Sequence, residues 1–107
     1  MRQKRNWNET VPDLATPEAL AEIKDLPENV RQRIRQTIKG LAQQPHPAQS
    51  KQLQFNNPDR QLFRIRLDNW RIVYTVTESE NAIDVLAVRK RPPYDYGDLV
   101  QLLEELE

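Results

Sequence analysis

The chain has 107 residues, which is enough for one domain with a modest core, and we expect no second domain. Its composition, 37% hydrophobic and 30% charged, is typical of a folded domain and excludes general disorder. The absence of cysteine excludes disulfides and thiolate metal sites, and with a single histidine we expect neither a metal nor a cofactor. No apolar run approaches the roughly 18 residues of a membrane span, and the polar start does not resemble a signal peptide, so we expect a cytoplasmic protein without membrane contact.

The formal net charge of zero conceals an asymmetry along the chain. Residues 1–30 carry four basic and six acidic groups, residues 31–91 carry twelve and five, and residues 92–107 carry none and five. A basic middle between acidic ends indicates an anion-binding surface, although pairing of basic and acidic faces within the fold explains the same totals.

Two helices are predicted first, after a weakly defined segment over residues 1–15. Thr16 is a fair N-cap before Pro17, and "PEALAEIKDL" has apolar residues at helical spacing. Pro27 opens the second helix, "PENVRQRIRQTIKGLAQQ", whose apolar stripe is Val30, Ile34, Ile38 and Leu41. We expect these helices to form an antiparallel hairpin.

A loop and an antiparallel meander follow. "PHPAQSKQ", from Pro45 to Gln52, is predicted to be a loop. Strands are predicted at about 61–67, 70–77 and 82–88, with turns at Asp68-Asn69 and "ESEN". One face of the first hairpin is apolar and must be covered by the helices, whereas the other carries Arg64, Arg66 and Arg71.

The last predicted element is an acidic C-terminal helix over residues 97–107, with leucines along one side. It either packs on its own sheet or docks on a partner. The fold class is therefore α+β, with an N-terminal helix hairpin packed on a small antiparallel sheet and a short C-terminal helix.

The arginines of the sheet are the candidate functional feature. A two-residue turn sets Arg66 opposite Arg71, and like charges in directly opposite positions destabilise a sheet. Pairing of the next two strands brings Arg71 opposite the region of Val88 and Arg89, so the basic end, Arg89 to Arg91, joins the patch. Without carboxylates beside them, these cations need an anion, and an RNA backbone supplies phosphates. The alternative is that each arginine is simply solvated on an outer face.

The two tyrosines that follow the basic patch have two interpretations, and the single histidine has one. Tyr94 and Tyr96 in "PPYDY" either stack on an unpaired base or anchor the turn after the third strand. His46, between two prolines, is interpreted as a solvated loop residue, since no titratable partner lies near it in sequence.

These segments together resemble a known family. "LPENVRQRIRQTIKGLAQQP", "KQL", "FRIRLDNWRIVYTV" and "IDVLAVRKRPPYDY" are similar to the RelE/ParE superfamily of bacterial toxin–antitoxin toxins, over roughly residues 16–96. The resemblance implies a RelE-like fold and a cognate antitoxin that forms a hetero-oligomer with the toxin. It makes the acidic C-terminal helix a candidate for displacement by that antitoxin.

The RelE-like branch implies a metal-independent endoribonuclease that cleaves mRNA in the ribosomal A site by attack of a ribose 2′-hydroxyl on the adjacent phosphate. By the same resemblance, Arg64 and Arg66 orient the nucleophile, Arg71 stabilises the phosphate charge, Arg91 is the general acid and Tyr94 stacks on a base. Further RNA-binding candidates are Lys51, Arg89, Lys90 and Tyr96. Because arginine keeps its proton far above neutral pH, Arg64 and Arg66 are poor general bases. The alternatives are a ParE-like toxin that poisons DNA gyrase without a nuclease site, and an inactive family member.

Overall fold

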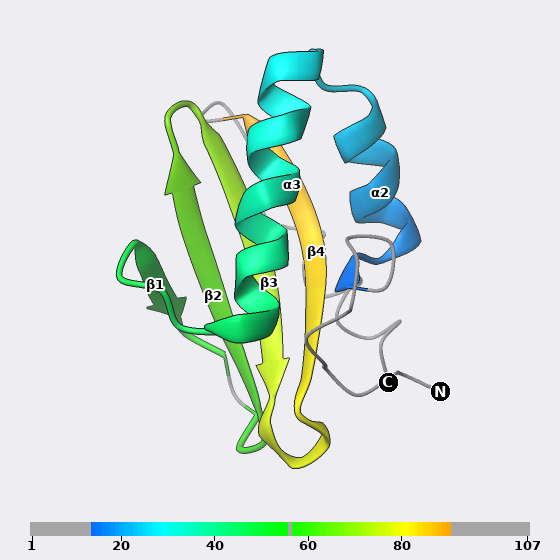
Figure 1. Cartoon of the computed structure of the whole chain (residues 1–107). Coiled ribbons are helices and arrows are strands. Elements are labelled where there is room, and N and C mark those ends of the chain that lie inside the picture. Colours follow the sequence, from blue (N-terminus) through cyan, green and yellow to red (C-terminus); the bar gives the residue numbers. More distant parts are fainter. Residues whose placement is uncertain (1–13, 56, 91–107) are drawn as a thin grey trace.

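The computed structural model describes residues 14–55 and 57–90, and these form two helices on one face of a four-stranded antiparallel sheet (Figure 1). The expected Arg91, Tyr94, Tyr96 and C-terminal helix, and the segment over residues 1–13, lie outside the described residues. Neither described helix is long and apolar enough to cross a membrane.

The helix hairpin is confirmed. Helix α2 spans Pro17–Lys24, and the Thr16 side chain caps it by accepting a hydrogen bond from the Ala19 backbone N–H at 3.2 Å. Helix α3 spans Glu28–Gln43 and runs antiparallel to α2 across the sheet (Figure 1). Its predicted stripe is buried at Ile34, Ile38 and Leu41, which are at most 1% exposed.

The sheet contains strands β1 (Ser50–Leu53), β2 (Arg60–Leu67), β3 (Trp70–Thr77) and β4 (Ala82–Lys90), in that order. The β2–β3 register confirms the predicted pairs Leu67↔Trp70 and Arg66↔Arg71. Between them Asp68 adopts a left-handed backbone with φ 55°, a conformation that aspartate tolerates better than most residues.

Strand β1 corrects the prediction of a loop from Pro45 to Gln52. No proline follows Pro47 in this segment, and the four residues of β1 pair with β2 from Ser50↔Ile65 to Leu53↔Leu62. The segment is only four residues long, so it gives little periodicity to recognise.

The two faces of the sheet have different apolar clusters. The helix side forms the main core, in which Ile65, Ile72 and Tyr74 are fully buried. The opposite side, which carries the arginines, has a smaller cluster of Leu62, Val73, Leu86 and Ala87, with Leu53 and Phe55 packed against it.

A β-bulge in β4 divides its residues between these faces. Tyr74 pairs with Val85 and Val73 pairs with Ala87, so Leu86 is an extra residue on β4. Strict alternation from Val85 would put Arg89 on the helix side of the sheet. The extra residue reverses this alternation, so Val88 joins the main core and Arg89 falls on the arginine face.

Candidate anion-binding site

Three arginines lie side by side across the sheet. Arg66 on β2 pairs with Arg71 on β3, and Arg71 pairs in turn with Arg89 on β4. The predicted proximity of Arg71 to the region of Val88 and Arg89 is therefore confirmed. We call Arg66, Arg71 and Arg89 the arginine row. Like charges in directly opposite positions cost roughly 0.2–1 kcal/mol per pair, so the row destabilises the free sheet unless an anion or a carboxylate compensates it.

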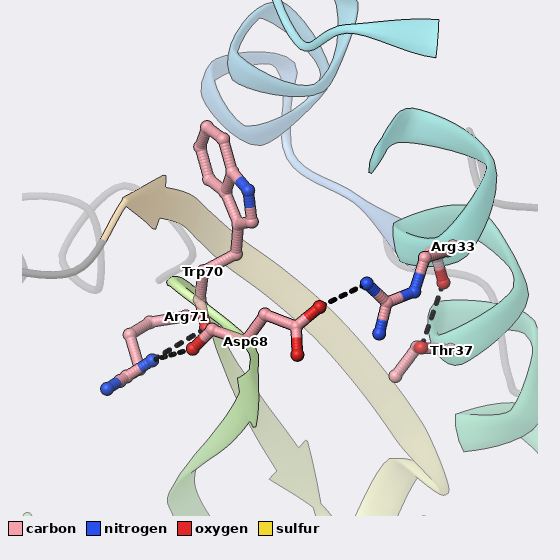
Figure 2. A network of polar contacts seen from close by, with 5 residues as sticks. All are labelled: Arg33, Thr37, Asp68, Trp70 and Arg71. Atoms are coloured by element: carbon pink, nitrogen blue, oxygen red, sulfur yellow. Dashed lines mark hydrogen bonds and ion pairs between the residues drawn. The ribbon is translucent and has the colours of Figure 1, made fainter. Parts of the chain in front are cut away.

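Arg71 is the buried centre of the row. Its side chain is only 4% exposed, and its Nη1 donates hydrogen bonds to the backbone oxygens of Asp68 (3.1 Å) and Trp70 (2.9 Å) (Figure 2). These carbonyls orient the guanidinium but leave its full charge uncompensated. Its Nε is buried without a hydrogen-bond partner. A buried polar group without a partner is costly, so this position is a strained and uncompensated positive charge at the centre of the row.

The turn that holds Arg71 is itself attached to helix α3. Arg33 of α3 forms an ion pair with the Asp68 carboxylate, while the Asp68 carbonyl accepts from Arg71 (Figure 2). Both members of the Arg33–Asp68 pair are more than half exposed, so the pair contributes little stability by itself. The pair holds the Asp68 carboxylate on the helix side of the sheet, away from the arginine row.

Arg89 has a carboxylate partner that sequence reasoning missed. Its Nε donates to Glu22 Oε2 at 3.0 Å, and Glu22 Oε1 accepts from the Val88 backbone N–H at 2.9 Å. Glu22 lies on α2, which packs along the outer edge of β4 (Figure 1). The expectation of a patch without carboxylates is therefore wrong for Arg89. The 67-residue separation of Glu22 and Arg89 leaves no local signal that could have revealed the contact.

The other described candidates lie around the row. Lys51 on β1 is exposed and pairs with Arg64 on β2, whose Nε is also buried without a partner. These two residues therefore extend the positive surface towards β1. Lys90 pairs with Trp70, which packs against the main core, so alternation sets Lys90 on the helix side of the sheet.

The loop histidine lies apart from the arginine row. The His46 ring packs against Phe63 with ring centroids 4.7 Å apart, and its Nε2 is 3.9 Å from Glu78 Oε1. Beside it the buried Tyr74 hydroxyl donates to the Pro45 carbonyl at 2.8 Å, and burial raises the pKa of Tyr74 to about 12. Within residues 14–55 and 57–90, no group of three His, Asp or Glu side chains could hold a metal ion.

Comparisons with known proteins identify the family. Residues 14–92 match the family model described as the ParE toxin of the type II toxin–antitoxin system, parDE. No curated protein matches this sequence.

Solved structures with this fold include toxins alone and in complex with antitoxins. The archaeal RelE–RelB complex from Pyrococcus horikoshii has a TM-score of 0.69 at 20% identity, over 88% of this chain and 100% of that one. The isolated E. coli RelE toxin has a TM-score of 0.57 at 19% identity, over 88% and 96% of the two chains. The intact E. coli RelBE toxin–antitoxin complex has 0.54 at 23% identity, over 72% and 92%.

Proposed function

Because the chain belongs to the ParE toxin family of type II toxin–antitoxin systems, we propose that this toxin is a ribosome-dependent endoribonuclease that inhibits translation. The observation that carries the proposal is the arginine row with the unpartnered Nε of Arg71 at its centre. The cation pair Arg64–Lys51 beside the row gives a phosphate chain a path across β1, β2 and β3.

The proposed reaction is attack of a ribose 2′-hydroxyl on the adjacent phosphorus. The O2′–P bond forms and the P–O5′ bond breaks, which leaves a 2′,3′-cyclic phosphate and a 5′-hydroxyl. The 2′-hydroxyl proton passes to water, and Arg91 donates a proton to O5′. Negative charge grows on the phosphate oxygens during this step, and fixed guanidinium groups stabilise it best.

The burial of each arginine supports the role that we propose for it. Arg66 is exposed and contacts a phosphate oxygen directly. Arg71 contributes its uncompensated charge from beneath the surface, held by the Asp68 and Trp70 carbonyls. Arg64, half-buried with a free Nε, positions the nucleophilic ribose. We propose that Tyr94 stacks on the base, and that Arg89 and Tyr96 contact the RNA nearby. Lys90, which was expected to bind RNA as well, is set on the helix side of the sheet and is given no role on this path.

Primer extension on mRNA in programmed ribosomes tests this proposal. The wild-type protein is expected to produce new 5′ ends within the A-site codon, and none on naked mRNA. Arg66→Gln is expected to abolish them, whereas Lys24→Gln, which removes an exposed charge on α2, leaves them unchanged. Intact mRNA with a folded wild-type protein, or equal cleavage by both variants, would refute the nuclease proposal.

Membership of the family makes an antitoxin the natural partner of the chain, and we propose that it covers the arginine row in a hetero-oligomer. An acidic segment would compensate the charges that the sheet leaves unpaired. Amide hydrogen exchange with and without the cognate antitoxin checks this surface. Slower exchange in β2 and β3 is expected, and unchanged exchange there would contradict it.

DNA gyrase is the second candidate target, favoured by the match to the ParE model and by the burial of Arg71, which limits its direct contact with RNA. Ribosomes and gyrase both place the toxin in the cytoplasm. A supercoiling assay with purified gyrase separates the two targets. Inhibition together with intact mRNA would establish the gyrase alternative, and a folded protein without either effect would be an inactive family member.

A further inference from the structure

A cavity of about 310 Å³ lies between the second half of α3 and the loop that leads into β1. It is remote from the arginine row, because α3 covers the opposite face of the sheet (Figure 1). Its lining consists of Gln36, Thr37, Gly40, Leu41, Gln44, Pro47 and Gln49. The volume is at the lower end of the range of small-ligand sites, roughly 300–1,000 Å³.

The lining of this cavity is rich in primary amides. Gln36, Gln44 and Gln49 are exposed, and each amide offers a donor and an acceptor side by side. The Thr37 hydroxyl donates to the Arg33 carbonyl at 2.9 Å, so its lone pairs remain as acceptors. Paired donors and acceptors on a planar group match the edge of a nucleobase, as glutamine does with adenine.

Gly40 provides the space in the cavity. It lies inside α3, where glycine is a poor helix former, and a Cβ built there meets no atom within 4 Å. Packing therefore does not require glycine at this position. The missing side chain instead leaves the helix surface open for a planar group to approach the backbone.

The charge around the cavity favours a polyanion. Residues 29–58, which include most of α3 and all of β1, contain no aspartate or glutamate. Arg35 and Lys39 are exposed on α3 and form no ion pair with a described residue, whereas Arg33, one turn from the cavity, is already paired with Asp68. An acidic group does lie beside the loop, because Glu78 Oε1 is 3.9 Å from His46 Nε2. A ligand with a neutral, hydrogen-bonding planar part and an anionic backbone fits this arrangement.

We infer that the cavity between α3 and the loop 45–49 binds an unpaired nucleobase of an RNA strand, whose phosphates lie against the cations of α3. The inference rests on the proposed function in one respect, namely that the target is RNA. An acidic peptide fits the charge equally well. It fits the lining less well, because peptides bind through apolar anchors or by strand addition, and Leu41 and Pro47 are the only apolar residues of the lining.

Substitutions at Gly40 test the inference without changing the charge. Gly40→Met fills the cavity with a flexible side chain and favours helix formation, whereas Gly40→Ala favours helix formation and leaves most of the cavity open. Fluorescence anisotropy with short single-stranded homopolymers of A, C, G and U measures binding to the purified chain. Gly40→Met is expected to weaken binding of at least one homopolymer by about tenfold, and Gly40→Ala by less than about twofold.

Side-chain NMR adds a readout that does not depend on the variants. On addition of RNA the amide signals of Gln36, Gln44 and Gln49 are expected to shift with a saturating dependence on concentration. Equal affinity of the Ala and Met variants, or amide signals that do not move, would overturn the inference. Shifts produced by an acidic peptide and not by RNA would assign the cavity to a protein partner instead.

Arg66→Gln separates this inference from the nuclease proposal. The variant changes the arginine row and leaves the cavity intact, so base-dependent amide shifts should persist in it even where cleavage is lost. If the wild-type chain cleaves no mRNA but the shifts occur, the nuclease proposal fails and the cavity assignment stands. If the wild-type chain cleaves mRNA but the amide signals do not shift, the cavity assignment fails and the nuclease proposal stands.

Discussion

Replacement of Tyr74 by phenylalanine should reduce the loss of stability at high pH. The Tyr74 ring is fully buried, and its hydroxyl donates to the Pro45 carbonyl at 2.8 Å. Loss of this single hydrogen bond is expected to cost about 1 kcal/mol near neutral pH. Because Pro45 begins the loop that lines the α3 cavity, the same bond holds that loop against β3.

Burial raises the pKa of Tyr74 to about 12 from the ordinary tyrosine value of 10.0. The folded state thus favours the neutral phenol. The contribution of this neutral phenol to the free energy of unfolding is complete below the unfolded pKa of 10.0, and it is lost as the pH rises through the folded pKa. The raised pKa corresponds to stability on the order of 3 kcal/mol that is lost at high pH, of which on the order of 1 kcal/mol is lost by about pH 11. Phenylalanine cannot ionise and escapes this loss.

Urea unfolding of wild type and Tyr74→Phe at about pH 8 and about pH 11 measures the free energy of unfolding of each protein. Because all other groups titrate alike in both proteins, their contributions cancel in the difference between the two free energies. Wild type should be the more stable by about 1 kcal/mol at the lower pH, and most of this advantage should be lost at the higher pH. A difference that stays constant with pH would refute the reasoning.

Substitutions at two further positions test the carboxylate beside the arginine row and the packing of the core. Glu22→Gln removes the charge beside Arg89 and should lower stability by about 1 kcal/mol while it strengthens binding of single-stranded RNA. Fluorescence anisotropy measures the RNA affinity of Glu22→Gln and of the control Glu18→Gln, which removes an exposed carboxylate of the same helix. An RNA affinity that Glu22→Gln leaves unchanged would show that Glu22 does not reduce the positive potential of the row. Ile34→Ala should cost about 2–5 kcal/mol and Ile34→Val about 0.5–1.5 kcal/mol, because Ile34 is 0% exposed on the core-facing side of α3. Similar urea midpoints for both variants would show that the helix is not packed as described.

The elements that the sequence predicts correctly depend on local signals. Thr16 and Pro17 mark the start of α2, and the apolar spacing of α3 matches its buried stripe. A two-residue turn leaves only one register for β2 and β3, so the pair Arg66↔Arg71 follows from the position of Asp68 and Asn69.

The features that the sequence misses are either too short to show a pattern or depend on distant partners. Strand β1 is four residues long and forms only because β2 offers an open edge. The ion pair of Arg89 with Glu22 and the ion pair of Arg33 with Asp68 each join elements far apart in the chain. Their formation depends on how α2 and α3 cover the sheet, which no local pattern encodes.

The sequence by itself determined the α+β class, the helix hairpin and the proximity of three arginines, because periodicity and turn length act over a few residues. Only the tertiary structure decided the state of each arginine. The extra residue Leu86 turns Arg89 to the arginine face, Glu22 then compensates its charge, and the packed sheet buries Arg71 with its Nε unpaired. Burial and charge compensation are set by groups from separate elements, so they exist only once those elements have packed together.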